Sequence, residues 1–533
     1  MRVAPPPSYG RTDHHHYGRL PPADLSGDTH VRRIFIVTLI VIGLLVGGAA
    51  AVAAWAWVQA SVDTAGEVEF TTPLAIPPLA DSHVDADGRR VFDLTATEGR
   101  HDFGAGPVDT WGFDGDYLGP TLRARRGEEV AVNVHNELDE VTTVHWHGMH
   151  LPAVMDGGPH QPIDPGQTWT PHWLVDQAAA TLWYHPHPHG ETEQHVYRGL
   201  AGMFIVDDDA TDALDLPDEY GVDDIPVIVQ DKRFDSDGQL SERRSFLSDS
   251  GLLGDTVVVN GTAGPYLDVT TELVRLRVLN GSTARTYDLG FADDRTFDLI
   301  GTDGGLLAEP HPTDRVMLSP GERAEIVVRM RPGERAVLRS YPPDLGIDHP
   351  GGRFVGRDDT LDVLELRAAA DLEPRPDVPR RLAEIPRLDP TEAATTRSFR
   401  LSGRNINGER MDMSRIDAVV EAGSVEIWEV RNADGMPHNF HIHDVQFQVL
   451  TMDGAPPPPE LSGWKDTIYL PPNVQFELIA RFSDFIDPDT PYMFHCHLLY
   501  HEDRGMMGQF IVVDDPGERP DPVEGGSGRH NHG

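Results

Sequence analysis

The sequence predicts an all-β protein whose related domains follow one apolar N-terminal segment. Short stretches that alternate between apolar and polar residues predict strands, and Gly, Pro and Asp residues separate them. No long amphipathic helix pattern lies between these stretches. A chain of 533 residues exceeds one ordinary hydrophobic core, so about two to four domains are expected. Many short strands with turn signals are typical of sandwiches or barrels.

The chain is strongly acidic. Its 86 Asp and Glu residues outnumber 44 Lys and Arg residues, which gives a formal net charge of −42. Such a charge argues against nucleic acid as a partner, because binding to phosphates depends on Lys and Arg. Only Lys232 and Lys465 are lysines. An acid excess with little lysine suits a well-hydrated surface, either in a salty environment or as a consequence of genome composition.

The N-terminal region predicts a membrane anchor. Residues 1–33 are polar and Pro-rich and are expected to form a disordered cytoplasmic tail. Residues 34–58 carry no charge and are long enough to span a bilayer. Arg32 and Arg33 precede this run, which places the N-terminus inside and everything after about residue 60 outside the cytoplasm.

A cleaved signal sequence is the alternative reading of the same segment. Residues 32–36 loosely resemble a twin-arginine export signal, and small residues suited to cleavage occur around residues 49–56. The apolar run is longer than a usual signal core, which favours the retained anchor. Either reading exports the rest of the chain, as an anchored or a secreted protein.

Three alternating segments predict three related β domains. Residues 126–147 read as a glycine turn, a strand, an Asn and a His-Trp-His sequence, and residues 422–443 repeat this order with His-Ile-His. A third strand, residues 273–279, ends in Asn280, but its successor carries no such histidine pair. Metal ligands are therefore expected in the first and third domains. The expected divisions are a linker 59–89, domain one 90–208, domain two 209–372, a linker 373–396, domain three 397–516 and a disordered tail 517–533.

The only cysteine of the chain lies between two histidines, in His495-Cys496-His497. The preceding residues 492–494 are apolar and aromatic and predict a strand, on which alternate side chains face opposite sides. Cys496 is then directed away from both histidines, so one segment can serve two metal sites. His501 and Met506 follow, and a thiolate, imidazoles and a distant thioether form the ligand set of a blue copper site. A lone buried cysteine in a core is the simpler alternative.

Four His-x-His pairs occur outside the tails, each after an apolar, strand-like run. Each pair places two imidazoles on one face of a strand. So many unpaired buried imidazoles would be costly, so eight converging ligands predict a cluster of several metal ions. Imidazole suits copper, zinc, iron or nickel, and the thiolate of Cys496 favours copper. The pairs are His145 and His147, His185 and His187, His441 and His443, and His495 and His497.

These segments resemble the multicopper oxidase family, and most closely its bacterial three-domain cuprous oxidases and laccases. The likeness covers about residues 90–515 and includes the segments 145–148, 183–187, 438–443 and 495–506 in family order. Stretches of the second domain, 274–281 and 301–305, also fit. The resemblance implies three cupredoxin-like Greek-key β-sandwich domains, with a type 1 copper in the third.

The resemblance also implies a role for each ligand. The type 1 copper would be held by His438, Cys496 and His501, with Met506 as the axial ligand. The type 2 copper would be held by His145 and His441. The two type 3 coppers would be held by His147, His185, His187, His443, His495 and His497. Electrons would pass from Cys496 through the backbone to His495 and His497, and oxygen would be reduced to two waters.

Four further residues match positions that the family uses. Asp156 and Glu502 match acids near the cluster and could supply protons, although each could also be a turn or solvated carboxylate. Asp434 and Met436 precede His438 at offsets where cuprous oxidases bind substrate Cu(I), and a thioether suits that soft ion. Met436 could instead simply pack over the copper. The chain lacks the Met-rich insertion of dedicated cuprous oxidases, which keeps phenol oxidation open.

The sequence therefore predicts an exported, monomeric oxidase that couples four one-electron oxidations to oxygen reduction. Phenols, Cu(I), Fe(II) and Mn(II) all remain open as the reductant. The alternative is a catalytically inactive protein of the same fold, either structural or copper-trapping. Histidines near the motifs but off the pattern are expected to support the site or lie at the surface: His150, His160, His172, His189 and His195.

Overall fold

The computed structural model describes residues 26–244, 248–482 and 484–517, and side-chain positions start at Val31. The chain divides into two compact units, Met1–Gln59 and Ala60–Gly533. The predicted disordered stretches 1–25 and 518–533 lie outside the described residues.

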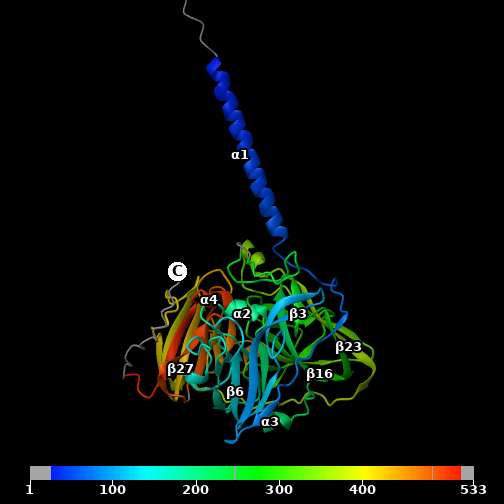
Figure 1. Cartoon of the computed structure of the whole chain (residues 1–533), viewed down its shortest axis with the longest axis vertical. Coiled ribbons are helices and arrows are strands. Elements are labelled where there is room, and N and C mark those ends of the chain that lie inside the picture. Colours follow the sequence, from blue (N-terminus) through cyan, green and yellow to red (C-terminus); the bar gives the residue numbers. More distant parts are fainter. Residues whose placement is uncertain (1–25, 245–247, 483, 518–533) are drawn as a thin grey trace, which may run out of the picture. The chain divides into compact units, whose positions relative to one another are not determined.

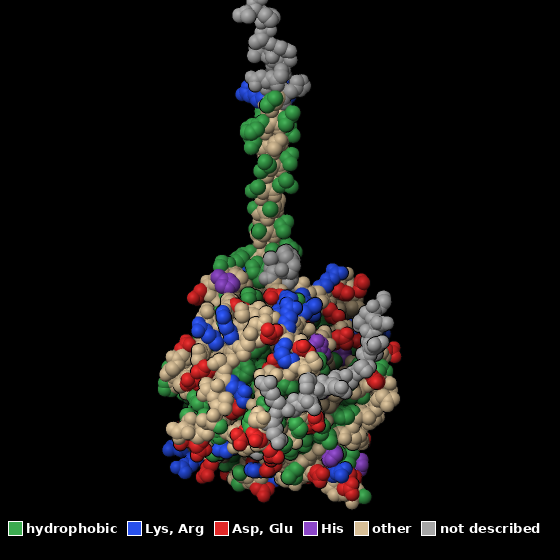
Figure 2. Space-filling model, turned by 90° about the vertical axis from the view of Figure 1, so that its left-hand side faces the viewer, with side chains coloured by type: hydrophobic (Ala, Val, Ile, Leu, Met, Phe, Trp, Pro, Cys, Tyr) green, Lys and Arg blue, Asp and Glu red, His purple; other side chains and the backbone are tan. Residues whose placement is uncertain are grey.

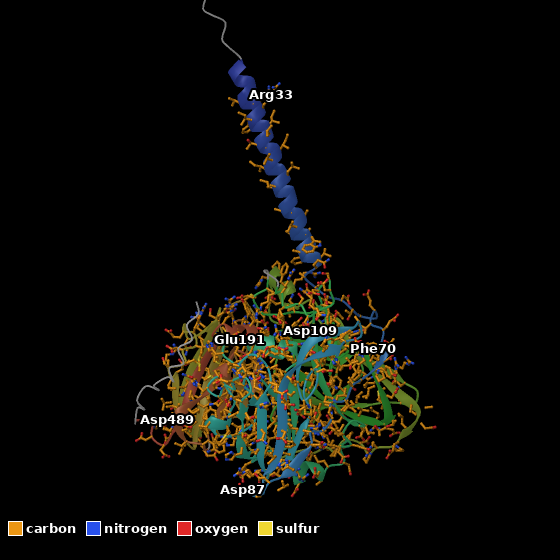
Figure 3. The ribbon with its side chains drawn as sticks, in the orientation of Figure 1. Arg33, Phe70, Asp87, Asp109, Glu191 and Asp489 are labelled. Atoms are coloured by element: carbon orange, nitrogen blue, oxygen red, sulfur yellow. The ribbon has the colours of Figure 1, made fainter. Side chains whose placement is uncertain are left out.

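The first unit contains one helix, α1 (Ser26–Val58), with the candidate membrane span Val31–Val58 at a mean hydropathy of 2.7. Hydrophobic side chains cover the visible sides of this helix in Figure 2, and Arg33 lies near its start in Figure 3. The prediction that all of residues 1–33 are disordered is wrong for residues 26–33. The helix begins eight residues ahead of the uncharged run 34–58.

Among the described residues of the second unit, strands form six sheets, which pair into three sandwiches (Figure 1). In the first sandwich, apolar side chains of β3, β6, β10 and β11 share one core. One sheet has the order β2-β3-β6-β8, with β4 on β3 and β9 on β6, and the other has the order β5-β11-β10-β7. Its elements are β2 (Ser82–Val84), β3 (Arg90–Asp102), β4 (Pro107–Phe113), β5 (Leu122–Arg125), β6 (Glu129–Asn136), β7 (His145–His147), η1 (Ala153–Met155), β8 (Thr168–Trp169), β9 (His172–Leu174), β10 (Ala180–His185), α2 (Thr192–Arg198), β11 (Gly202–Asp207) and α3 (Asp209–Asp212).

The second sandwich has its own core between sheets of order β1-β15-β23-β22-β17-β20 and β14-β13-β12-β16-β21-β18-β19. Some of its strands, such as β15, alternate between buried and exposed residues. Others, such as β12 and β16, are buried along their whole length, as expected where both faces of a sheet are covered. Its elements are β1 (Thr72–Pro73), β12 (Asp224–Lys232), β13 (Thr256–Val259), β14 (Thr262–Ala263), β15 (Pro265–Thr271), β16 (Leu273–Asn280), β17 (Tyr287–Phe291), β18 (Phe297–Thr302), β19 (Gly305–Thr313), β20 (Val316–Leu318), β21 (Arg323–Arg329), β22 (Arg335–Tyr341), η2 (Pro350–Val355) and β23 (Leu361–Glu373).

The third sandwich joins sheets of order β25-β24-β27-β31-β29 and β26-β33-β32-β28-β30 around an aromatic core that includes Trp428. Cys496 and Met506 belong to this core. Its elements are η3 (Pro390–Glu392), β24 (Ala393–Ser402), β25 (Asn405–Ile406), β26 (Ala418–Glu421), β27 (Ser424–Asn432), β28 (His438–Ile442), β29 (Phe447–Met452), η4 (Pro459–Leu461), β30 (Thr467–Leu470), β31 (Gln475–Phe482), β32 (Asp487–His495), α4 (Leu499–Asp503) and β33 (Met507–Val513).

Three buried asparagines mark the repeat that the sequence predicts. Asn136, Asn280 and Asn432 each end the corresponding strand, β6, β16 or β27. Each side-chain NH₂ donates to two backbone carbonyls, and each side-chain oxygen accepts the backbone N–H two residues later. The amide thereby closes the loop that leads to the next strand. That strand carries histidines in the first and third sandwiches only.

Both predicted linkers contain ordered structure. Within residues 59–89, β1 pairs in parallel with β15 and β2 pairs with β3. Backbone N–H groups of Val62 and Gly66 donate to Asp359 and Asp362 of the second sandwich at 2.8 and 2.7 Å. In the second linker, β24 begins at residue 393 because it pairs in parallel with β27. The sequence alone does not predict this order, because the partners of these segments are backbone and carboxylate groups far away in the chain.

Surface acids explain where the net charge resides. Figure 3 shows Asp87, Asp109 and Asp489 on the outside of the second unit, on loops and strand edges. In Figure 2 the visible face of this unit carries acidic and basic side chains mixed with apolar ones.

Candidate metal centre

Cys496, His438 and His501 come together in the third sandwich, and all three are buried. The Cys496 Sγ lies 3.7 Å from Nδ1 of His438 and 3.5 Å from Nδ1 of His501, and the two ring nitrogens are 3.1 Å apart. Cys496 follows β32, His438 begins β28, and His501 lies on α4. A thiolate and two imidazoles in a triangle match a blue copper site.

Met506 belongs to the same core and is fully buried. Its carbonyl accepts the N–H of Cys496 at 3.1 Å, and its own N–H donates to the carbonyl of His501 at 2.9 Å. These two bonds hold the backbone of Met506 beside the trio.

The outer ring nitrogens of the trio also have partners. Nε2 of His438 lies 3.3 Å from the carboxylate of Asp434, and Nε2 of His501 lies 2.8 Å from the carbonyl oxygen of Asp249. Met436 is partly buried and packs on an apolar cluster that includes Leu345. The structure therefore places Asp434 and Met436 at the His438 edge of the trio.

The eight remaining predicted histidines converge between the first and third sandwiches and are all at most 1% exposed. In one group, Nε2 of His495 lies 3.2 Å from Nε2 of both His187 and His443. In a second group, Nε2 of His185 lies 3.4 Å from Nδ1 of His147 and from Nε2 of His497. The ring nitrogens of the first group all lie within 4.8 Å of one another, and in the second group the ring centroids of His147 and His497 are 4.9 Å apart.

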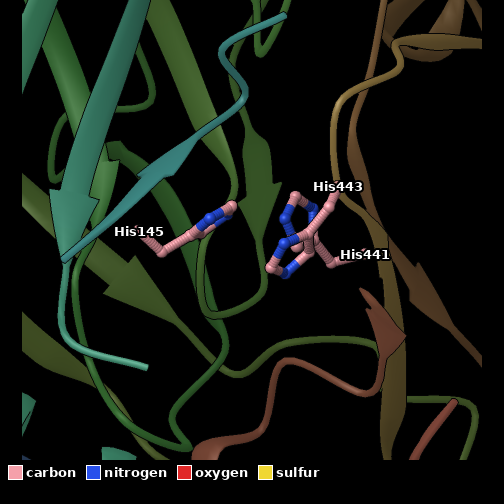
Figure 4. Close-up of side chains that lie close together, drawn as sticks. All are labelled: His145, His441 and His443. Atoms are coloured by element: carbon pink, nitrogen blue, oxygen red, sulfur yellow. The ribbon is translucent and has the colours of Figure 1, made fainter. Parts of the chain in front are cut away.

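His145 and His441 remain, and Figure 4 shows the ring of His145 directed towards the rings of His441 and His443. The ring of His145 stacks on that of His443 with centroids 3.8 Å apart, and the ring of His441 lies 5.8 Å from that of His145. The Nε2 atoms of His145 and His441 are buried and have no hydrogen-bond partner. Such orphaned nitrogens are costly unless something binds them, which fits a metal site.

Strand pairing brings these residues together. His145 on β7 pairs with His185 on β10, and His441 on β28 pairs with His495 on β32. His145 and His147 share one face of β7, because alternate residues of a strand do so. In the other three pairs the first histidine lies on a strand and the second lies one or two residues after that strand ends. Cys496 lies between His495 and His497 and faces the other site, as the alternation predicts.

Acceptors hold the ring nitrogens that face away from the centre. Nδ1 of His443 lies 2.7 Å from Oδ2 of Asp156, and Nδ1 of His145 lies 3.0 Å from the carbonyl oxygen of Asp156. Glu502 lies 3.3 Å from Nδ1 of His187 and 3.2 Å from Nδ1 of His495. Acceptors of this kind fix the tautomer and ring orientation of metal-binding histidines.

The protonation states suit a metal centre. Burial, followed by the neighbouring imidazoles, holds the pKa values of His185, His441 and His443 well below the ordinary value, so these rings are neutral. Burial alone would raise the pKa of the Cys496 thiol, but His501 and His438 lower it to about 5. Metals bind neutral imidazole and thiolate, so His185, His441, His443 and Cys496 need no further deprotonation near neutral pH. Burial alone would lower the pKa of His438, but Asp434 and Cys496 raise it to about 9, so a metal must displace a proton there.

The structure adds residues that the sequence reading missed. Asp466 lies 3.0 Å from Nε2 of His147, and Arg323 of the second sandwich pairs with Asp466. Asp444, next to His443, pairs with His150 at 2.7 Å. No local pattern marks these residues, because their partners lie far away in the sequence. Of the histidines expected to be supporting or surface residues, His195 is fully buried, with Nδ1 3.1 Å from the hydroxyl of Thr142.

Copper fits this donor set. The buried trio offers two imidazoles and a thiolate, and eight further imidazoles form two triads and a pair. Bound copper would give the unpartnered ring nitrogens a partner. Copper ions here would carry electrons one at a time.

Comparison with known proteins gives one consistent family. Residues 95–211 and 380–516 each match a family model described as multicopper oxidase. A relative from Staphylococcus haemolyticus, "Multicopper oxidase mco", is 36% identical over 83% of this chain and 92% of its own length. "Cell division protein FtsP" of Salmonella typhimurium is 38% identical over 83% of this chain and 92% of its own length.

Solved structures agree with the fold. A laccase from Pediococcus acidilactici Pa5930 superposes with a TM-score of 0.76 at 37% identity and covers 84% of this chain and 94% of its own. This likeness confirms the prediction of cupredoxin-like sandwiches behind one apolar helix.

Proposed function

The chain belongs to the multicopper oxidase family and is an oxidase, and from this premise we propose that it couples four one-electron oxidations to the reduction of oxygen to two waters. The observation that carries the proposal is the complete set of buried donors in one blue-copper trio, two triads and one orphaned pair. Bound copper would accept electrons singly from a reductant and deliver them to oxygen.

We assign four coppers by ligand. His438, Cys496 and His501, with Met506 as a further ligand, would hold the type 1 copper. His145 and His441 would hold the type 2 copper. The triad of His187, His443 and His495 and the triad of His147, His185 and His497 would hold the two type 3 coppers. Cys496 connects the two sites through its own backbone to both neighbouring histidines, a path of few bonds.

Asp156 and Glu502 are proposed as proton suppliers, since oxygen reduction consumes protons. Both are buried, Oδ1 of Asp156 has no hydrogen-bond partner, and the two oxygens of Glu502 face Nδ1 of His187 and of His495 at 3.3 and 3.2 Å. Burial alone would raise the pKa of the Glu502 carboxyl, but His187 and His495 hold it below the ordinary value. Glu502 is therefore ionised at rest and ready to accept and pass on a proton.

The reductant is proposed to be Cu(I) or a phenol. Asp434 lies within 3.3 Å of His438, and Met436 lies two residues before this histidine. A carboxylate and a thioether together suit Cu(I) as a substrate. His438 would then receive the electron over a short distance. Fe(II) and Mn(II) are further candidate reductants. The carboxylate of Asp434 suits these harder ions better than the thioether of Met436 does.

A structural role is the second candidate, because one relative is named as a cell division protein. The donor set of this chain argues against that role as the main function, since a purely structural protein needs no set of orphaned ring nitrogens. Copper trapping without turnover is the third candidate.

We propose that α1 anchors the oxidase in the cell membrane as a monomer, with the sandwiches outside the cytoplasm; secretion after cleavage is the alternative. The uncharged run of α1, residues 34–58, and the two arginines directly before it, Arg32 and Arg33, support the anchored form.

Oxygen uptake by the full-length, copper-loaded protein in detergent tests the function. Cu(I), Fe(II), Mn(II) and a phenol are supplied in turn. We expect uptake with Cu(I) or the phenol, with one oxygen consumed for every four electrons. If the protein binds copper but consumes no oxygen with any of these reductants, the proposed oxidase function is refuted. The structural role or the copper-trapping role would then remain.

A further inference from the structure

A turn of the second sandwich lies against the metal centre, although no proposed ligand comes from that sandwich. Residues 319–322 connect β20 to β21, which begins at Arg323. Gly321 has a φ of +88°, and a Cβ there would lie 3.1 Å from the ring of His497. The side chain of Asn439, next to His438, donates to the Ser319 hydroxyl and the Pro320 carbonyl. Glycine thus allows the turn to approach the ligands closely.

Arg323 leaves this turn fully buried and has all five of its N–H donors used. Two donate to the two carboxylate oxygens of Asp466, at 2.8 and 2.5 Å. The other three donate to the carbonyl oxygens of Thr181, Gly321 and Asp303. A bidentate pair with every donor satisfied fixes the carboxylate in one orientation.

Asp466 in turn contacts two ligands. Its Oδ1 lies 3.0 Å from Nε2 of His147, and its carbonyl oxygen lies 2.9 Å from Nδ1 of His441. The hydroxyl of Thr467 donates to the same Oδ1 at 2.9 Å and lies 3.1 Å from both ring nitrogens. A carboxylate at Nε2 of His147 keeps the proton there and leaves Nδ1 free to face His185.

The backbone around Asp466 is held from the same sandwich. Asp303 accepts the N–H groups of Asp466 and Thr467, both at 3.3 Å, and the N–H of Arg323 at 2.8 Å. Lys465 lies 3.0 Å from Asp303 and 2.8 Å from Glu322. These charges are all buried, so removing one partner leaves another unpaired.

We propose that Arg323 is a positioning residue of the copper cluster, which holds Asp466 so that Asp466 fixes His147 and His441. The second sandwich, without ligands of its own, thereby completes the geometry of the type 2 copper and of one type 3 copper. This inference rests on the ligand assignment under the proposed function.

The test compares Arg323→Gln and Arg323→Lys with matched variants of Arg285. Arg285 is also a buried arginine of the second sandwich, with two carboxylate partners, Asp231 and Asp359. Among the described residues it forms no hydrogen bond or ion pair with a proposed ligand. Each full-length protein in detergent is titrated with copper under reducing conditions and is then reoxidised in air, because Cu(I) gives neither a paramagnetic resonance nor a blue absorption. Copper content, the electron paramagnetic resonance of the type 2 copper and the blue absorption are then measured.

We expect Arg323→Gln to weaken copper binding in the cluster about 10- to 100-fold and to change the type 2 resonance, with the blue absorption retained. Arg323→Lys should lose less, because it keeps the charge but not the bidentate geometry. The Arg285 variants should match the parent in all three measurements. If Arg323→Gln does not accumulate, Asp466→Asn tests the same link from the other side.

Unchanged cluster affinity and type 2 resonance in the Arg323 variants would overturn the inference. Equal losses in the Arg285 variants would do the same, since a general loss of stability would then explain them. A parent protein without type 2 and blue signals would instead refute the proposed function, so the two failures are distinguishable.

Discussion

At the scale of single residues, replacing Cys496 is the most direct test of the ligand assignment. Replacing it with Ser removes the thiolate while leaving the imidazoles of both sites in place. The variant should lose the blue colour and oxidase activity but keep the cluster coppers, because His495 and His497 remain. Absorption and copper analysis check this result.

A matched control for Cys496→Ser is Ala480→Ser, which adds a hydroxyl to the same core without contact to a proposed ligand. It should stay blue and active. A blue Cys496→Ser protein would contradict the assignment, whereas loss of colour in both variants would indicate a damaged core.

Asp434 and Met436 decide the choice of reductant. The double variant Asp434→Ala, Met436→Ala removes the carboxylate beside His438 and the nearby thioether but no proposed copper ligand. If Cu(I) is the substrate, its oxidation should fall by at least about tenfold, since both soft and charged contacts are lost, while phenol turnover persists. Steady-state oxygen uptake on both reductants measures this difference.

The surface variant Asp489→Ala in the same sandwich serves as the control and should leave both rates unchanged. Equal loss on both reductants, or loss on neither, would rule out a Cu(I) site at this edge.

At the scale of elements, the buried asparagines explain why three sandwiches share one loop geometry. Asn280→Ala removes two donors and leaves the carbonyls of Arg285 and Leu318 without them, at a cost of roughly 1–3 kcal/mol each. The denaturation midpoint should fall, while the blue absorption of the folded protein stays, because His438, Cys496 and His501 all lie in the third sandwich. Asn133→Ala, at an exposed side chain, should change the midpoint little.

Much of the fold and most of the site could be predicted at this scale. A His-x-His pair on a strand is a local pattern, so its shared face follows from alternation alone, and His441 does pair with His495 across strands. The contacts of Asp466 and Arg323 could not be predicted, because 143 residues separate them and neither lies in a recognisable motif. The contact of Val62 with Asp359 could not be predicted from the sequence either, because it consists of one backbone N–H that donates to a remote carboxylate.

At the scale of the whole molecule, contacts between sandwiches make the metal centre a joint product of all three. His150 of the first sandwich lies between Asp444 and Asp484 of the third, at 2.7 and 2.8 Å. Burial alone would lower the pKa of His150, but the two carboxylates raise it to about 9.

This pairing predicts a pH dependence of stability. The folded-state pKa of His150 exceeds its ordinary value of about 6.5, so its contribution is complete below about pH 6.5 and is lost as the pH rises towards 9. The contribution is on the order of 2–3 kcal/mol at most. His150→Gln should therefore lower the unfolding temperature at pH 6 more than at pH 9.5. His135→Gln, at a more exposed histidine of the same sandwich, is the control, and an equal effect at both pH values would refute the prediction.

The last prediction concerns the anchor. If α1 spans the membrane with Arg32 and Arg33 inside, the tail before it is cytoplasmic and the sandwiches are outside. Protease added to intact cells should then digest the oxidase and spare an N-terminal epitope, which becomes sensitive only after permeabilisation. Asp359→Asn provides a control, because it weakens the docking of Val62 on the second sandwich without changing the apolar span. A mature chain that begins near residue 57 in mass spectrometry would refute the anchor and establish a cleaved signal, since nothing apolar enough to span a membrane follows among the described residues.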